Sequence, residues 1–74
     1  MILGEKTREY IARRNRLQYE YAKPYLPIHV SLETTPEREL RKEVREALTY
    51  LSMDDRRNYR QDCQELYDEV YGDE

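Results

Sequence analysis

Residues 35–51, TPERELRKEVREALTYL, contain the clearest helical pattern in the chain. Apolar residues recur there at spacings of three and four, which is typical of a helix with one apolar side. They are Leu40, Val44, Ala47, Leu48 and Leu51. Thr35 is placed to cap this helix, and Pro36 suits its first position, where no amide hydrogen is needed. We therefore expect a helix over about 36–51.

A second helical pattern begins directly after the first. Ser52 and Asp55 stand three residues apart, the spacing of a capping box at a helix start. The apolar side of the segment then runs through Tyr59, Cys63, Leu66, Tyr67 and Val70, and Gly72 ends it. We expect this helix over about 53–71. Because so few residues join the two helices, we expect them to pack as an antiparallel helical hairpin.

The N-terminal part predicts a further helix, over about 5–22. Its apolar side carries Tyr10, Ile11, Leu17, Tyr21 and Ala22. The helix should end before Pro24, because the residue preceding a proline is pushed out of the helical conformation.

A proline-containing segment, KPYLPIHVSLETT at 23–35, joins the first helix to the second. Ile28, Val30 and Leu32 alternate with polar residues, which is a short strand pattern. We favour an extended strap that lies over the helices with its apolar side inward. The alternative is a strand that pairs with the sheet edge of a partner.

These patterns predict an all-α protein. We expect a single small domain over 1–74, built as a three-helix unit: a helix, a proline-rich extended strap and then a helical hairpin. A chain of 74 residues buries only a small core. An exposed apolar stripe on the last two helices would also permit a homodimer with four packed helices.

Several classes of function are disfavoured by what the sequence lacks. The chain has one cysteine, Cys63, and one histidine, His29, far apart in sequence, which argues against a metal site and against a disulfide within the chain. We see no glycine-rich phosphate loop and no nucleophile paired with a base, so we expect neither an enzyme nor a cofactor. There is no apolar run near the ~20 residues of a membrane span. We expect the cytoplasm or another reducing intracellular compartment.

Tyrosine and acidic residues are the features that point to binding. The eight tyrosines are the only aromatic residues, and tyrosine suits interfaces because it joins an apolar ring to a polar hydroxyl. In the last helix, Tyr67 and Tyr71 flank a group of acids: Asp62, Glu65, Asp68 and Glu69. A solvated acidic helix is the ordinary explanation. The alternative is docking onto a basic surface, such as the groove of a nucleic-acid-binding protein.

The first helix adds three further candidates, Tyr10, Arg14 and Tyr21, which share one side of it. Arg14 either covers the edge of the core with its aliphatic stem or forms an arginine–tyrosine patch of the kind enriched at interfaces. The predicted partner-binding residues are Tyr10, Arg14, Tyr21, Asp62, Glu65, Tyr67, Asp68, Glu69 and Tyr71.

Arg13 and Arg16 raise the alternative of an arginine-rich helix that binds RNA. Glu9 stands four residues before Arg13, and Glu20 four residues after Arg16, so both arginines have an acid within reach on the same side of the helix. Because an RNA-binding helix needs an unneutralised basic face, we keep this as a minor alternative.

The sequence therefore predicts a non-enzymatic protein-binding module. We expect a small regulator or inhibitor, as viruses often encode, that docks an acidic and tyrosine-bearing helical surface on a larger, nucleic-acid-handling protein. The alternative is an accessory structural subunit of a large assembly, such as a ribosome or an organellar complex.

Overall fold

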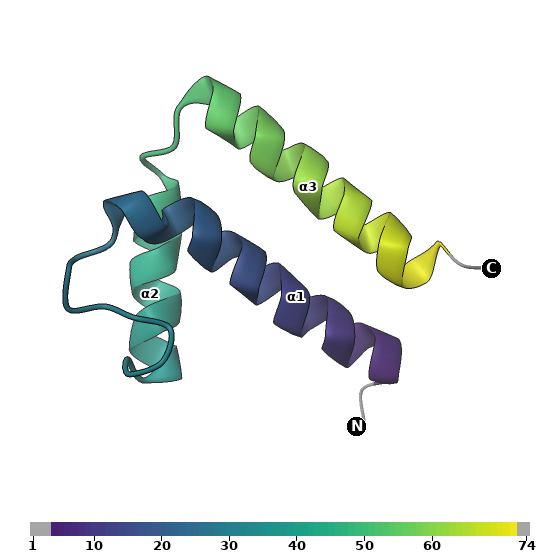
Figure 1. Cartoon of the computed structure of the whole chain (residues 1–74), viewed down its shortest axis with the longest axis horizontal. Helices are drawn as coiled ribbons and strands as arrows, with labels where there is room; N and C mark the ends of the chain where they lie inside the picture. The colour runs from purple at the N-terminus through teal and green to yellow at the C-terminus, as the bar shows by residue number, and fades with distance from the viewer. Residues whose placement is uncertain (1–3, 73–74) are drawn as a thin grey trace.

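The computed structural model describes residues 4–72. Three α-helices account for most of them: α1 (Glu5–Ala22), α2 (Glu37–Leu48) and α3 (Met53–Tyr71), with a short 3-10 helix, η1 (Lys23–Tyr25), directly after α1. No strand occurs within the described residues. The predicted all-α class is confirmed (Figure 1).

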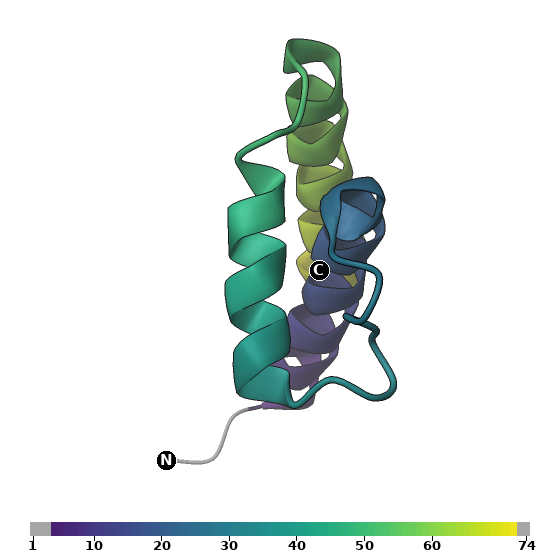
Figure 2. The ribbon, with the colours of Figure 1, turned by 90° about the vertical axis from the view of Figure 1, so that its left-hand side faces the viewer.

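The helix α1 lies at the centre of the fold. α3 runs antiparallel beside α1, and α2 packs against the C-terminal part of α1 (Figure 1). No Cα atom of α2 comes within 8 Å of one in α3. Figure 1 shows α3 running away from α2 along α1, and in Figure 2 α2 lies to one side of α1 and α3. This corrects the predicted hairpin of the second and third helices, because the antiparallel pair that packs is α1 with α3.

The connection between α2 and α3 explains why these two neighbours in sequence do not pair. Arg56, in the first turn of α3, donates hydrogen bonds to the carbonyl oxygens of Leu51 at 3.2 Å and Thr49 at 3.0 Å. These bonds hold the connection in a fixed turn and give partners to carbonyls left free beyond the end of α2. The turn directs α3 along α1 instead of back along α2.

The buried core is small because the fold is flat. The Cα atoms span 41 × 31 × 17 Å, so every helix keeps a wide exposed surface. The apolar residues that are buried are Ala22, Val30, Val44, Ala47, Leu51, Leu66 and Val70. Ala22 and Ala47, with 0% and 2% of their surface exposed, lie where α1 meets α2. Small side chains at this contact allow the two backbones to approach closely.

The segment that joins α1 to α2 is a series of turns, which corrects the predicted extended strap. The amide of Val30 donates to the carbonyl of Pro27, and the amide of Thr35 donates to that of Ser31. Val30 is buried, but Ile28 is fully exposed. Prolines favour turns by fixing φ, and serine and threonine side chains bond to nearby backbone in place of a strand partner.

The helix starts follow the sequence prediction in one case and depart from it in the other. The hydroxyl of Ser52 caps α3 by accepting from the amide of Asp55 at 3.1 Å, as expected. At α2, Pro36 is the N-cap and not the first helical residue. The hydroxyl of Thr35 accepts instead from the amide of Ser31 at 2.9 Å, so it closes the preceding turn and does not cap the helix.

Candidate functional site

The structure gathers three tyrosines from the two ends of the chain into one cluster. We call Tyr10, Tyr67 and Tyr71 the tyrosine cluster. The ring centroids lie 5.8 Å apart for Tyr10 and Tyr67, 5.6 Å for Tyr10 and Tyr71, and 4.8 Å for Tyr67 and Tyr71. Half of the surface of Tyr67 is exposed. The antiparallel pairing of α1 with α3 builds this cluster, because it places the start of one helix against the end of the other.

Two further contacts fix the tyrosine cluster. The hydroxyl of Tyr71 donates to the hydroxyl of Thr7 in α1 at 3.2 Å. The guanidinium of Arg14 lies 5.7 Å from the centre of the Tyr10 ring, within the range of a cation–π contact. The Nε atom of Arg14 is buried and has no hydrogen-bond partner among the described residues. Arg14 thus covers the seam between α1 and α3 while keeping hydrogen-bonding capacity unused.

Tyr21 is held at the other end of the α1–α3 seam. It stands eleven residues from Tyr10 in α1, which corresponds to about 16 Å along the helix axis. Its hydroxyl donates to the carboxylate of Asp62 at 2.5 Å, and its ring packs edge-on against Tyr59. The hydrogen bond to Asp62, helped by burial, raises the pKa of Tyr21 to about 12. These contacts join α1 to α3, and they separate Tyr21 and Asp62 from the tyrosine cluster.

The other predicted acids divide between two sides of α3. Glu65 and Glu69 line a hollow of about 380 Å³ on the α1 side, together with Arg13 and Arg16. Tyr67 lies two residues from Glu65 and so points roughly 200° away around the helix. The predicted surface of acids and tyrosines is therefore split, with most of the acids turned toward α1.

The two arginines of the alternative RNA-binding helix lie on this acidic side. Arg13 pairs with Glu69 at 3.0 Å and with Glu9 at 3.5 Å, so the predicted contact with Glu9 is present. The hydrogen bond with Glu69 is the main reason that the pKa of Arg13 is raised. No ion pair within 4.0 Å joins Arg16 to Glu20 in the part of the chain that the structure describes.

Two acids of α3 are hydrogen-bonded to glutamine side chains of the same helix. Glu65 accepts from the side chain of Gln61, and Asp68 from that of Gln64, both at 3.2 Å. Both acids are exposed, and neither makes an ion pair within residues 4–72. Glu65 adds negative charge on the α1 side of α3, and Asp68 adds it next to Tyr67.

Sequence reasoning missed a basic surface on α2. We call Arg38, Arg41, Lys42 and Arg45 the basic stripe; all four are exposed. Arg38 stands three and four residues before Arg41 and Lys42, and Arg45 stands four and three residues after them. Residues at this spacing share one side of a helix. The signal was therefore present in the sequence and could have been found by placing the charged residues of α2, and not only its apolar ones, around the helix axis.

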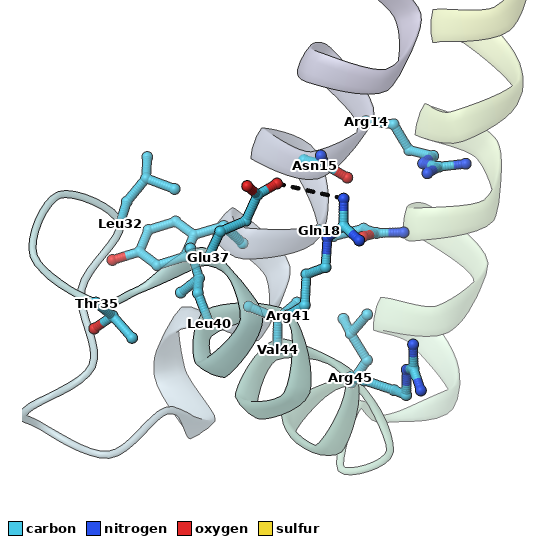
Figure 3. A pocket seen from close by; sticks show the side chains of 12 residues that line it. Arg14, Asn15, Gln18, Leu32, Thr35, Glu37, Leu40, Arg41, Val44 and Arg45 are labelled. Carbon is cyan, nitrogen blue, oxygen red and sulfur yellow. Dashed lines mark hydrogen bonds and ion pairs between the residues drawn. The ribbon is translucent and has the colours of Figure 1, made fainter. Parts of the chain in front are cut away.

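A cleft of about 610 Å³ between α1 and α2 borders the basic stripe. Its apolar lining comes from Tyr19, Leu32, Leu40, Val44 and Leu48. Arg14, Arg41 and Arg45 supply positive charge, and Figure 3 shows their side chains together with the ion pair of Arg41 and Glu37, at 3.3 Å. We refer to this feature as the α1–α2 cleft.

Exposed apolar side chains also occur at the far end of the molecule from the tyrosine cluster. Tyr25 and Tyr50 pack together with ring centroids 6.3 Å apart, and Tyr50 keeps 69% of its surface exposed. Met53 is 77% exposed. None of these three residues was a predicted site residue.

The residues that the structure describes contain no group of three or more histidine, cysteine, aspartate or glutamate side chains that would hold a metal ion. Within 4–72, no helix has both the length and the apolar character that crossing a bilayer requires. Cys63 is a free thiol, half-buried on α3. No protein-family model, curated protein or solved structure matches this chain.

Proposed function

We propose that the protein is a non-enzymatic protein-binding module that docks on a larger protein through the tyrosine cluster. The observation that carries this proposal is the meeting of Tyr10, Tyr67 and Tyr71 at one exposed site with Arg14 beside them. Tyrosine and arginine are enriched among the residues that contribute most to binding energy at interfaces.

The charge on the flank of the cluster favours a basic partner. Asp68, next to Tyr67 in α3, is exposed and has no cation within ion-pair distance among the described residues. Glu65 is also exposed and unpaired within these residues, on the α1 side of the same helix. Charge complementarity would steer such a surface toward a positively charged one. A nucleic-acid-handling protein carries a surface of this kind, and a small acidic protein seated on it would act as a regulator or inhibitor.

The competing proposal is an accessory subunit of a large assembly. It is supported by the apolar side chains that the chain leaves exposed away from the cluster, above all the fully exposed Ile28, together with Tyr50 and Met53. A subunit embedded among neighbours would cover them. A docking module would use the tyrosine cluster and leave them in water.

The test is quantitative capture of partners from an extract of the organism that encodes the chain, with matched variants. Tyr67→Ala removes a half-exposed ring from the cluster, and Tyr50→Ala removes an exposed ring from the opposite end. We expect Tyr67→Ala to reduce capture of one protein about tenfold or more, and Tyr50→Ala to leave it unchanged. Helicity of each variant is checked by circular dichroism.

Charge reversal separates the roles of the acids. Glu65→Lys with Asp68→Lys should weaken capture of the same protein, whereas Glu39→Lys with Glu46→Lys on α2 changes the net charge equally and should not. If Tyr67→Ala and Tyr50→Ala lose the same partners to the same degree, the tyrosine cluster is not the docking surface. Loss of many subunits of one assembly with Tyr50→Ala alone would favour the accessory subunit.

A further inference from the structure

The basic stripe on α2 is not explained by the stability of its own helix. Like charges at spacings of three and four repel each other by about 0.2–0.5 kcal/mol per pair. Of the four residues of the basic stripe, only Arg41 has an ion-pair partner among the described residues, namely Glu37 at 3.3 Å. Glu39 and Glu46 stand three and four residues from Lys42 and lie within its reach, whereas no acid stands three or four residues from Arg38 or Arg45. The helix therefore presents one concentrated positive face to solvent.

The α1–α2 cleft places apolar surface directly beside this positive face. Leu40, Val44 and Leu48 line the cleft from the same helix that carries the stripe. Arg41 and Arg45 belong both to the stripe and to the cleft lining. The absence of contact between α2 and α3 keeps one side of α2 uncovered. A ligand seated here would meet aliphatic side chains and guanidinium groups at the same time.

We propose that the α1–α2 cleft and the basic stripe bind an acidic amphipathic helix of a partner protein. An aliphatic side chain of that helix would enter the cleft, and its carboxylates would pair with Arg41 and Arg45, whose planar guanidinium groups bind carboxylates with two parallel hydrogen bonds. The stripe runs from Arg38 to Arg45, eight residues of helix, and its ends lie about 10 Å apart along the axis, which matches two turns of the bound helix. Docking of an apolar helix face into such a groove is a recurring mode of peptide recognition.

The lining of the cleft favours a peptide over a nucleic acid. Nucleic acids use a positive groove together with aromatic side chains on which their bases stack. Here the only aromatic residue of the lining is Tyr19, and the apolar surface beside the polar and charged residues comes from the aliphatic side chains of leucine and valine. Arg14 borders both this surface and the tyrosine cluster. Arg41 and Arg45 belong only to the cleft, and Tyr67 only to the cluster, so variants at these residues test the two proposals separately.

The experiment measures binding of a designed probe by fluorescence anisotropy. The probe is a labelled helical peptide of about 16 residues, or four turns, with leucines along one side, glutamates on the flanks and alanines elsewhere. One control peptide has glutamine in place of glutamate, and a second has alanine in place of leucine. A single-stranded RNA of similar length is the third control.

Two pairs of protein variants test the arginines, and each pair lowers the net charge by the same amount. Arg41→Ala with Arg45→Ala removes two basic groups from the cleft, and alanine keeps the helix propensity high. Arg8→Ala with Arg57→Ala removes two exposed basic groups from α1 and α3, outside the cleft. We expect the first pair to weaken binding of the leucine–glutamate peptide about tenfold or more, and the second pair to change it less than about twofold.

Both control peptides should bind about tenfold more weakly than the probe, because each lacks one of the two features that the cleft recognises. The proposal is overturned if the alanine-for-leucine peptide binds as well as the probe, which would mean that only charge matters. It is also overturned if RNA binds more tightly than the probe through the same arginines. Sedimentation that shows a dimer lost on Arg41→Ala with Arg45→Ala would assign the surface to a second copy of the chain instead.

Discussion

Single residues at the seam between α1 and α3 combine structural and titratable roles, and Tyr21 shows this most directly. Its phenol donates to the carboxylate of Asp62, and ionisation would replace that hydrogen bond with repulsion between two anions. The pKa of Tyr21 is therefore raised from its ordinary value near 10 to about 12. A group whose pKa is higher in the folded state stabilises that state fully below its unfolded pKa and loses the effect as pH rises through the folded value.

We predict that the free energy of unfolding falls between about pH 10 and pH 12 and that Tyr21→Phe removes part of this fall. Chemical denaturation at several pH values measures the change, and tyrosinate absorbance follows the ionisation. Burial also raises the pKa of Tyr59, which therefore adds to the pH dependence of every variant. The test is therefore the difference in pH dependence between Tyr21→Phe and a control variant. Tyr50→Phe is the matched control, since the hydroxyl of Tyr50 makes no side-chain hydrogen bond in the described residues. Equal pH dependence of the two variants would show that the bond to Asp62 is not formed in solution.

The candidate site could be predicted from the sequence only in part, and the reason lies at this scale. Residue type points to four of the predicted partner-binding residues: Tyr10, Arg14, Tyr67 and Tyr71. The fold brings these four together. Their meeting depends on which helices pair, which periodicity does not reveal. The acids were grouped by helix position alone. One of these acids, Glu69, pairs with Arg13 of α1, which lies far away in the sequence. An ion pair between residues so distant in the chain leaves no local pattern in the sequence.

The elements themselves were largely predictable, whereas their packing was not. The periodicity of three and four identified all three helices, and Ser52 marked the start of α3. The short connection between α2 and α3 indicated a hairpin. The hydrogen bonds from Arg56 to carbonyls of that connection set its direction, and no sequence rule anticipates them. The strand pattern at Ile28 and Val30 failed because turns closed by proline, serine and threonine satisfy the backbone locally.

The close contact between α1 and α2 limits the size of the side chain that position 47 can hold. Ala47 has 2% of its surface exposed and packs in one cluster with Ala22 and Val44. We predict that Ala47→Leu lowers the free energy of unfolding by about 1–3 kcal/mol, because the added atoms have no space between the two helices. Urea denaturation measures the loss. Ala12→Leu, at an exposed position of α1, is the control and should have little effect. If the Ala47→Leu variant is more stable than the original chain, the contact between α1 and α2 has unfilled space that accommodates the larger side chain.

At the scale of the whole molecule, α1 is the helix on which the other two depend. α2 and α3 each pack on α1, and no Cα atom of α2 comes within 8 Å of one in α3. Removing α2 from this arrangement would leave an antiparallel pair, α1 with α3, that retains Leu66, Val70 and the tyrosine contacts. Removing α3 would expose the greater part of α1. Loss of α2 therefore disturbs the rest of the fold less than loss of α3 does.

We predict that weakening the two contacts of α1 has different consequences for hydrogen exchange. Val44→Ala, on α2, should speed amide exchange in α2 while α1 and α3 keep most of their protection, because local opening of one helix leaves the other pair intact. Leu66→Ala, on α3, should speed exchange in all three helices, because α1 loses the neighbour that covers most of its length. Exchange followed by mass spectrometry of peptides from each helix distinguishes the two patterns.

Equal loss of protection everywhere in both variants would show that the three helices unfold as one cooperative unit. In that case α2 could not open by itself to admit a partner into the α1–α2 cleft, and a bound helix would have to enter the cleft as it stands.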